Sequence, residues 1–291
     1  MSFSSRPLSR RDALKGAALA ALGYPLLRPL SMFAAAPVSL PDRTHGIRLG
    51  LASYSLNTLS VDQVIAVVSQ LELKTVSLFR LHCPWGTGTV EECRTVVKKF
   101  ADAGITVTST GVVELPNDEA VVRKAFDNIK GAGLKKFVGR PTIESLPLVE
   151  KFVKEYDVIV AIHNHGPTDR YPKAADALKA IQPYDKRIGL CLDVGHGWLA
   201  DEDPAASIRL ARDRVYEVHL KDTRGPKDGK SADAGPVIVG RGLVDIKAVL
   251  AALVEIKFAH EVEFEYEEPV PNKVPGLAES VGYTRGLLAA M

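Results

Sequence analysis

Eight short β-rich runs alternate with amphipathic helical patterns along this chain, and this alternation limits the fold more than any other feature of the sequence. The runs are residues 47–53, 75–82, 105–113, 135–139, 158–165, 188–195, 215–221 and 261–267. Stretches between them, such as 90–104 and 118–133, place apolar residues at i, i+3 and i+4, begin near acidic residues and stop at glycine. Strand and helix units in alternation predict a parallel sheet.

The number of repeats decides between two architectures. A length of 291 residues fits two small domains or one large α/β barrel. No linker or change of composition interrupts the eight units, and no glycine-rich phosphate loop follows the first run. We therefore expect a single α/β domain over residues 37–291, a (β/α)8 TIM barrel rather than a doubly wound dinucleotide-binding sheet. Residues 222–242, after the seventh run, are expected to form a long loop at the active face.

Residues 1–36 differ from the rest and have the order of segments found in an export signal. Arg10 and Arg11 precede an apolar stretch, and small residues at 34–36 suit a cleavage site. The paired arginines favour the twin-arginine route, although Ala13 stands where a large apolar residue is usual. The alternatives are an amphipathic first helix or a membrane anchor, but the apolar run is short for a bilayer, which takes about 20 residues to span. The expected location is periplasmic or otherwise exported, without membrane attachment after cleavage.

The charge of the remaining chain argues against nucleic acid as a partner. The whole sequence has a formal net charge of +2, and five basic residues against Asp12 give residues 1–36 a charge of +4, which leaves −2 for the rest. Nucleic-acid binding needs clustered Lys and Arg. Three cysteines form neither a spaced metal motif nor a disulfide framework. A small molecule is therefore the expected partner, and the sequence leaves homo-oligomerisation open.

Four neighbouring runs end in ionisable residues that are costly to bury. In a barrel, catalytic groups project from the C-terminal ends of the strands. The four ends carry, in chain order, His163-Asn164-His165, Asp193 with His196, His219 with Lys221, and a series of glutamates. Buried ionisable groups without partners cost several kcal/mol, so these ends need a common explanation. A divalent metal ion supplies one.

The alternation of side chains along each run selects the metal ligands. Apolar residues fill every second position of the eighth run, so the glutamates between them point into the barrel: Glu261, Glu263, Glu265 and Glu267. The predicted ligands, one from each run, are His163, Asp193, His219 and Glu265. Two imidazoles and two carboxylates suit Mn, Zn, Co or Fe(II) better than Ca or Mg, and the donor set leaves the identity of the single metal ion open.

Each candidate also has a purely structural interpretation. Either histidine of the fifth run could be a core residue, Asp193 could cap a helix although DVGHG is a poor helix start, and the glutamates could form a solvated face. His82 and Trp198 could be packing residues rather than substrate contacts. The set predicted to bind substrate is His82, His165, His196, Trp198 and Lys221.

These strand ends resemble the xylose isomerase-like TIM-barrel superfamily, in particular the sugar phosphate isomerase/epimerase group with its ketose 3-epimerases and inosose dehydratases. The motifs that carry the resemblance are LDVGH (192–196), VHLKD (218–222), VGRGLVD (239–245) and EYE (265–267). The resemblance implies one divalent metal held by residues from strands five to eight. It matches Asp193, His219 and Glu265 to family ligands and His196 to a substrate contact.

The fifth run departs from the family pattern. The family's glutamate, usual in a Glu-Asn-His context, is His163 here. An imidazole bound to the metal cannot collect a proton, so an epimerisation that uses two glutamates does not transfer to this chain. The expected catalytic pair is Glu265 as the base and His163 as a metal-holding group. With a metal that polarises a carbonyl, this pair suffices for proton abstraction next to that carbonyl.

The resemblance implies a metal-dependent enzyme of isomerase or epimerase type that acts on a carbohydrate. A lyase or dehydratase on a keto-sugar, for example a 3-keto-glycoside, uses the same first step and is favoured by the departure at His163. The non-enzyme alternative is a periplasmic sugar-binding barrel. The family's DNA-repair branch, with three zinc ions, is disfavoured by the acidic charge and by too few ligands in the early strands.

Overall fold

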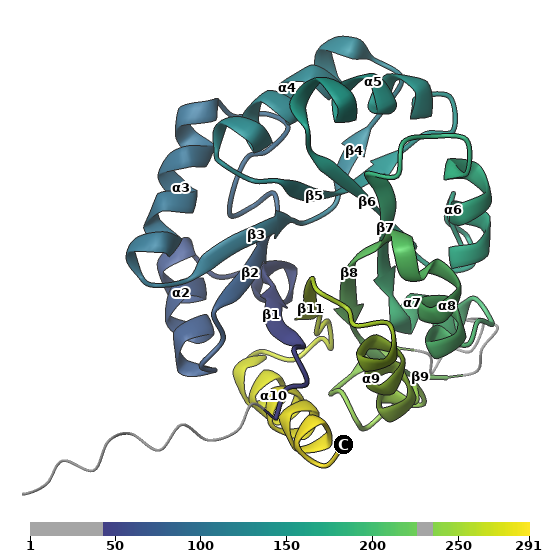
Figure 1. The fold of residues 1–291 in the computed structure, drawn as a ribbon. Coiled ribbons are helices and arrows are strands. Elements are labelled where there is room, and N and C mark those ends of the chain that lie inside the picture. Colours follow the sequence, from purple (N-terminus) through teal and green to yellow (C-terminus); the bar gives the residue numbers. More distant parts are fainter. Residues whose placement is uncertain (1–42, 226–234) are drawn as a thin grey trace, which may run out of the picture. The chain divides into compact units, whose positions relative to one another are not determined.

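A curled parallel sheet of nine strands forms the centre of the protein, and helices surround it (Figure 1). The structure, a computed structural model, describes residues 43–225 and 235–291, so the predicted signal at 1–36 lies outside the described residues. The strands follow the order β3-β2-β1-β11-β8-β7-β6-β5-β4. Their bounds are β1 (Arg48–Ala52), β2 (Thr75–Leu78), β3 (Thr106–Thr110), β4 (Val113–Leu115), β5 (Lys136–Pro141), β6 (Ile159–His163), β7 (Ile188–Asp193), β8 (Val215–Leu220) and β11 (Glu261–Phe264).

The third predicted run closes the barrel. It contains β3, which pairs with β2, and ends at the first residue of β4, which pairs with β5, so the segment 106–115 joins the two ends of the strand order. Gly111 lies at the break, where an added Cβ atom would come within 2.9 Å of the Phe79 Cα atom. Each of the eight predicted runs therefore contains a strand, and the TIM-barrel architecture is confirmed.

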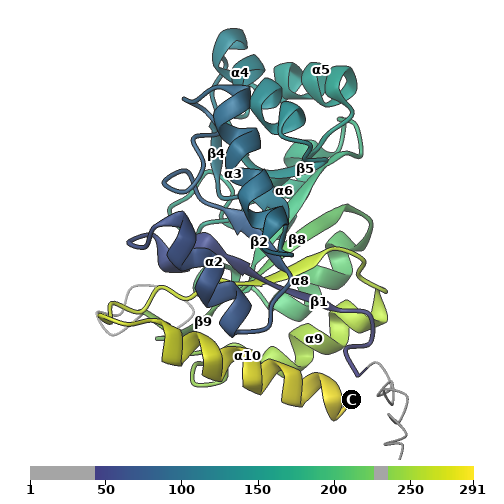
Figure 2. The same cartoon turned by 90° about the vertical axis from the view of Figure 1, so that its left-hand side faces the viewer.

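Helices between the strands cover the outside of the sheet (Figures 1 and 2). Ser60 and Thr89 form capping boxes at the first two helices, and the Asp118 carboxylate caps the third. Among the described residues, no helix is long and apolar enough to cross a bilayer. The helices are α2 (Val61–Gln70), α3 (Val90–Asp102), α4 (Glu119–Gly131), α5 (Leu146–Tyr156), α6 (Ala174–Ile181), α7 (Val194–Leu199), α8 (Pro204–Ala211), α9 (Ile246–Glu255) and α10 (Val274–Ala289), with 3-10 turns at Ser53–Leu56 and Arg212–Arg214.

Strand β11 shows why the interior of this barrel is unusually polar. Its apolar residues, Val262 and Phe264, are fully buried in the hydrophobic core. Its glutamates face inward, and Glu261 reaches Lys136 of β5, a strand on another side of the barrel, at 2.7 Å. The predicted alternation of the eighth run is thus present, with one inward glutamate already paired inside the barrel.

Three segments differ from the sequence-based expectations. Residues 222–242 hold two short antiparallel strands, β9 (Asp222–Arg224) and β10 (Gly235–Val237), where a loop without structure was expected. The second run ends as a strand at Leu78, before His82. The sixth run turns into helix α7 directly after Asp193, so DVGHG does begin a helix.

Candidate metal centre

Four buried side chains converge where β6, β7, β8 and β11 end: His163, Asp193, His219 and Glu265. One ligand atom from each lies within 4.8 Å of every other. His219 Nδ1 is 3.2 Å from Glu265 Oε2, and His163 Nε2 is 3.7 Å from Asp193 Oδ2. Donor atoms that each lie about 2 Å from one ion are separated by roughly 3 to 4 Å. The spacing therefore suits a single metal ion, and the structure brings all four predicted ligands together.

The hydrogen bonding of these side chains tests whether a cation fits. Within the described residues, both ring nitrogens of His163 and both of His219 are buried without a hydrogen bond, and Asp193 Oδ2 is buried beside the Lys221 ammonium group. Most buried polar atoms in proteins have such a partner. A divalent cation would satisfy ligand atoms from three different strands at once. The donor set thus fits a metal ion on geometry as well as on chemistry.

Lys221 adds the one ammonium group of the centre. Its Nζ atom lies 3.1 Å from Asp193 Oδ2, 3.0 Å from Glu265 Oε2 and 3.3 Å from Glu267 Oε1. Burial alone would raise the pKa of Glu265, but Lys221 and His219 outweigh it and hold that pKa below its usual value. The carboxylates of Asp193, Glu265 and Glu267 thus surround one ammonium group, an excess of acidic groups that favours a bound cation.

Asp193 has two roles at once. Its Oδ1 atom accepts a hydrogen bond from the backbone N–H of His196 and caps helix α7. Its Oδ2 atom faces the ligand cluster. The structural alternative for this residue is therefore correct, and it does not compete with the metal-binding interpretation, because the two oxygens serve different partners.

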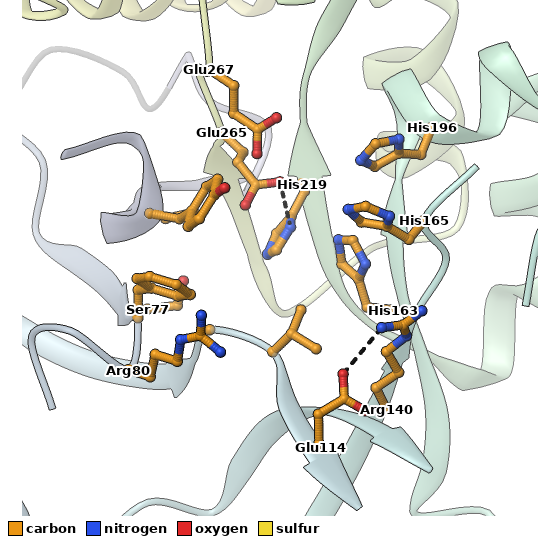
Figure 3. A pocket seen from close by; sticks show the side chains of 15 residues that line it. Ser77, Arg80, Glu114, Arg140, His163, His165, His196, His219, Glu265 and Glu267 are labelled. Carbon is orange, nitrogen blue, oxygen red and sulfur yellow. Dashed lines mark hydrogen bonds and ion pairs between the residues drawn. The ribbon is translucent and has the colours of Figure 1, made fainter. Parts of the chain in front are cut away.

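A cavity of about 410 Å³ opens beside the ligands (Figure 3). His163, His219 and Glu265 line it, and so do His165 and His196, whose ring centroids are 4.2 Å apart. Burial and the nearby Lys221 charge lower the pKa of His196 to about 3, which leaves its imidazole neutral and able to accept or donate a hydrogen bond. The cavity is large enough for a small-molecule substrate.

The opposite wall of the cavity comes from the first half of the barrel and was missed by the sequence analysis. Tyr54 and Phe79 pack edge to face at 4.7 Å, and the Arg80 guanidinium lies 5.3 Å from the Phe79 ring centroid. Figure 3 shows Arg80 at this side of the cavity and Arg140 closer to His163, with Glu114 paired to Arg140 at 3.1 Å. All of these residues follow strands or lie at their ends, which is the signal that could have found them.

A family model described as xylose isomerase-like TIM barrel matches residues 141–287, just over half of the chain. The chain belongs to the xylose isomerase-like TIM barrel family. No curated protein matches the sequence.

Solved structures similar to this xylose isomerase-like barrel include an epimerase, a zinc-bound protein and a probable dehydratase. L-ribulose 3-epimerase is 16% identical, with a TM-score of 0.66, over 84% of this chain and 95% of its own. The IOLI protein with a zinc atom bound is 17% identical, with a TM-score of 0.66, over 83% and 96%. The probable 3-DHS dehydratase AsbF of Bacillus anthracis is 13% identical, with a TM-score of 0.64, over 83% and 98%. At these low sequence identities, the similarity to the three structures shows a shared fold and no more.

The xylose isomerase-like barrel does not bring every predicted substrate contact to the cavity. His82 is buried outside the cavity lining, with Nδ1 2.8 Å from Ser53 Oγ and Nε2 3.1 Å from the Leu59 carbonyl oxygen. Trp198 packs against the hydrophobic core from α7 and is also absent from the lining. As placed, both are packing residues. Lys221 pairs with Asp193 but does not line the cavity, whereas His165 and His196 do.

Proposed function

We propose that the protein is a divalent-metal-dependent enzyme that abstracts a proton next to a carbonyl group of a carbohydrate, in an isomerisation or epimerisation. The observation that carries the proposal is the donor set beside the cavity, in which the buried ring nitrogens of His163 and His219 make no hydrogen bond among the described residues. A bound divalent ion would polarise the carbonyl and stabilise the developing enediolate charge. Its identity, among Mn, Zn, Co, Fe and Mg, is open.

The side chains around the cavity have separable roles in this proposal. Glu265 offers an ionised carboxylate at the cavity wall and takes the proton. Glu267 is a second carboxylate on the same wall, and burial raises its pKa. His165 and His196 offer ring nitrogens to substrate hydroxyl groups. Lys221 keeps Asp193 and Glu265 ionised before a cation arrives.

A second candidate reaction is elimination from a keto-sugar, for example a 3-keto-glycoside. It begins with the same proton abstraction and differs in the group that leaves. The observation that favours it is His163, an imidazole in the donor set where two-glutamate epimerases have a second carboxylate. Glu265 is then the one carboxylate of the donor set that lines the cavity. A single base suits a reaction in which a proton is removed from one face of the substrate and none is returned to the other face. We also propose export through residues 1–36, which would give the enzyme access to free sugars and glycosides.

Solvent-deuterium exchange tests both reactions in one experiment. Metal-loaded protein is incubated in D2O with ketoses and, separately, with 3-keto-glycosides, and label at the α carbon and released aglycone are measured. We expect label without release for isomerisation or epimerisation, and release for elimination. Exchange with neither class, together with micromolar sugar binding, would instead support a non-catalytic sugar-binding barrel.

The variants Glu265→Gln and Glu267→Gln identify the base. We expect Glu265→Gln to abolish exchange while the folded protein remains, because the amide cannot accept the proton. Glu267→Gln should keep most of the exchange. Metal content is measured for each variant, so that a lost base is distinguished from a lost ion. Unchanged exchange in Glu265→Gln at full metal content would refute its role.

A further inference from the structure

Glu217 lies one inward position below His219 on strand β8. Both side chains are buried, and Glu217 has no exposed surface. Glu217 Oε1 is 3.5 Å from His219 Nε2, and Glu217 Oε2 is 3.0 Å from Lys136 Nζ. Lys136 also donates hydrogen bonds to Glu261 Oε2 at 2.7 Å and to the Tyr216 carbonyl oxygen at 2.9 Å. A fully buried carboxylate thus lies between a fixed ammonium group and a predicted metal ligand.

The two ring nitrogens of His219 face different surroundings. Nδ1 points to the ligand cluster, 3.2 Å from Glu265 Oε2, while Nε2 points down to Glu217. At 3.5 Å the contact with Glu217 is longer than an ordinary N–H···O hydrogen bond. Neither Nε2 nor Glu217 Oε1 makes a hydrogen bond of ordinary geometry elsewhere in the described part of the chain, although the Cys191 thiol lies close to both side chains.

A neutral imidazole that binds a metal through one nitrogen carries its proton on the other. A carboxylate behind that second nitrogen accepts the proton's hydrogen bond and so fixes both the tautomer and the ring orientation. Glu217 is placed to do this for His219, and Lys136 holds the carboxylate in its ionised, oriented form.

We propose that Glu217 is a positioning residue for the metal centre, one that directs the Nδ1 lone pair of His219 toward the other ligands and is itself held by Lys136. The inference rests on the proposed metal site but adds a residue outside it. It also explains why a barrel interior, normally filled with apolar side chains, keeps a glutamate and a lysine below the ligands.

One alternative use of the same residues is a second metal ion. Cys191, Glu217 and His219 each offer an atom within 4.8 Å of the other two. Lys136, however, already places a positive charge 3.0 Å from Glu217, where a second cation would be repelled. The positioning role therefore fits this cluster better, and metal stoichiometry distinguishes the two.

The test compares Glu217→Gln with Glu261→Gln. Each substitution removes one of the two carboxylates that pair with Lys136, but only Glu217→Gln removes the contact with His219. Zinc and cobalt affinities are measured on the full chain by competition with a chromophoric chelator, and the Co(II) absorption spectrum reports the coordination geometry. We expect Glu217→Gln to weaken metal binding by roughly 10- to 100-fold and to alter the Co(II) spectrum. Glu261→Gln should stay within about twofold of the wild type with an unchanged spectrum.

The outcomes separate the inference from the proposed function. A wild-type protein that binds no metal overturns both. A wild-type protein that binds one ion, with equal affinities and spectra in Glu217→Gln and Glu261→Gln, overturns the inference alone. Two ions per chain would favour the second metal site and overturn it as well. If Glu217→Gln does not fold, the double variant Lys136→Met/Glu217→Gln, which removes the buried lysine too, is measured in its place with the same expected loss.

Discussion

The side-chain amide of Asn164 bonds both backbone groups of Asp193 across neighbouring strand ends. Asn164 Nδ2 donates to the Asp193 carbonyl oxygen at 3.0 Å, and the Asp193 N–H donates to Asn164 Oδ1 at 2.8 Å. The middle residue of His163-Asn164-His165 therefore fixes the backbone of one ligand while its neighbour His163 supplies another. This pair links β6 and β7 at the level of the predicted metal ion.

We expect Asn164→Asp to weaken the metal site. The substituted carboxylate cannot donate to the Asp193 carbonyl oxygen and places a buried charge beside it. The lost hydrogen bond and the unpaired acceptor should lower the free energy of unfolding by about 2 kcal/mol. Metal affinity should fall about tenfold, because Asp193 is no longer held in place.

Chemical denaturation and chelator competition measure both effects of that substitution. Asn272→Asp is the matched control, since exposed Asn272 only accepts a hydrogen bond, from Val274 N–H, which aspartate can also accept. An Asn164→Asp protein as stable and as metal-competent as this control would contradict the role assigned to the amide.

Asp222 organises the segment that follows strand β8. Its carboxylate accepts hydrogen bonds from the backbone N–H groups of Thr223, Gly240, Gly242 and Val244 at 2.8 to 3.1 Å. Asp222→Asn turns two of these donors toward an amide N–H group, so we expect a loss of about 2 to 4 kcal/mol in the free energy of unfolding. Urea titration measures this loss. Asp245→Asn, at a helix N-cap that asparagine also suits, should change stability by less than about 0.5 kcal/mol.

The Asp185–Arg187 pair predicts how stability changes at acid pH. Hydrogen bonds from the Arg187 side chain and backbone lower the pKa of Asp185 from its ordinary 3.8 to about 2. A pKa that is lower in the folded state stabilises the protein above the unfolded value, and the stabilisation is lost as pH falls from about 4 to 2. The Asp185 side chain remains 19% exposed and the Arg187 side chain 33%. Because solvent screens such a pair, we expect it to contribute about 1 kcal/mol or less to the free energy of unfolding.

Thermal unfolding of Asp185→Asn across pH 2 to 7 checks this expectation. The variant should be less stable than the wild type at pH 7, and the two curves should approach each other below pH 4. A difference that is constant across the range, or that grows toward acid pH, would show that the ionised carboxylate is not what stabilises the turn.

The parallel barrel and the four side chains that converge at its strand ends could be predicted because both depend on local patterns. The alternation of glutamates with apolar residues on the eighth run indicates which side chains point into the barrel. Parallel strands then bring their carboxyl ends to one face of the barrel. The same parity placed Glu267 inside the barrel and, applied to the seventh run, would also have indicated Glu217, two residues before His219. Their neighbours on other strands, above all Lys136, give them their roles, and one sequence does not show which strands meet across a barrel.

Other features of the site depend on contacts that no local pattern contains. His82 ends a run that looks like the others, but its strand stops at Leu78 and its ring turns to Ser53 and Leu59. The residues DVGHG start a helix despite two glycines, because Asp193 caps it and Asn164 holds the preceding backbone. The glycine between β3 and β4, Gly111, is required by the closeness of Phe79, which no local pattern reveals.

Metal analysis of protein purified without chelators tests the central claim most directly. We expect about one divalent ion per wild-type chain, an empty or nearly empty site in His163→Ala, and full retention in His165→Ala, whose histidine lines the cavity outside the donor set. A wild-type protein without metal that also fails to take up Mn, Zn or Co, or a His163→Ala protein that binds metal as the wild type does, would contradict the account.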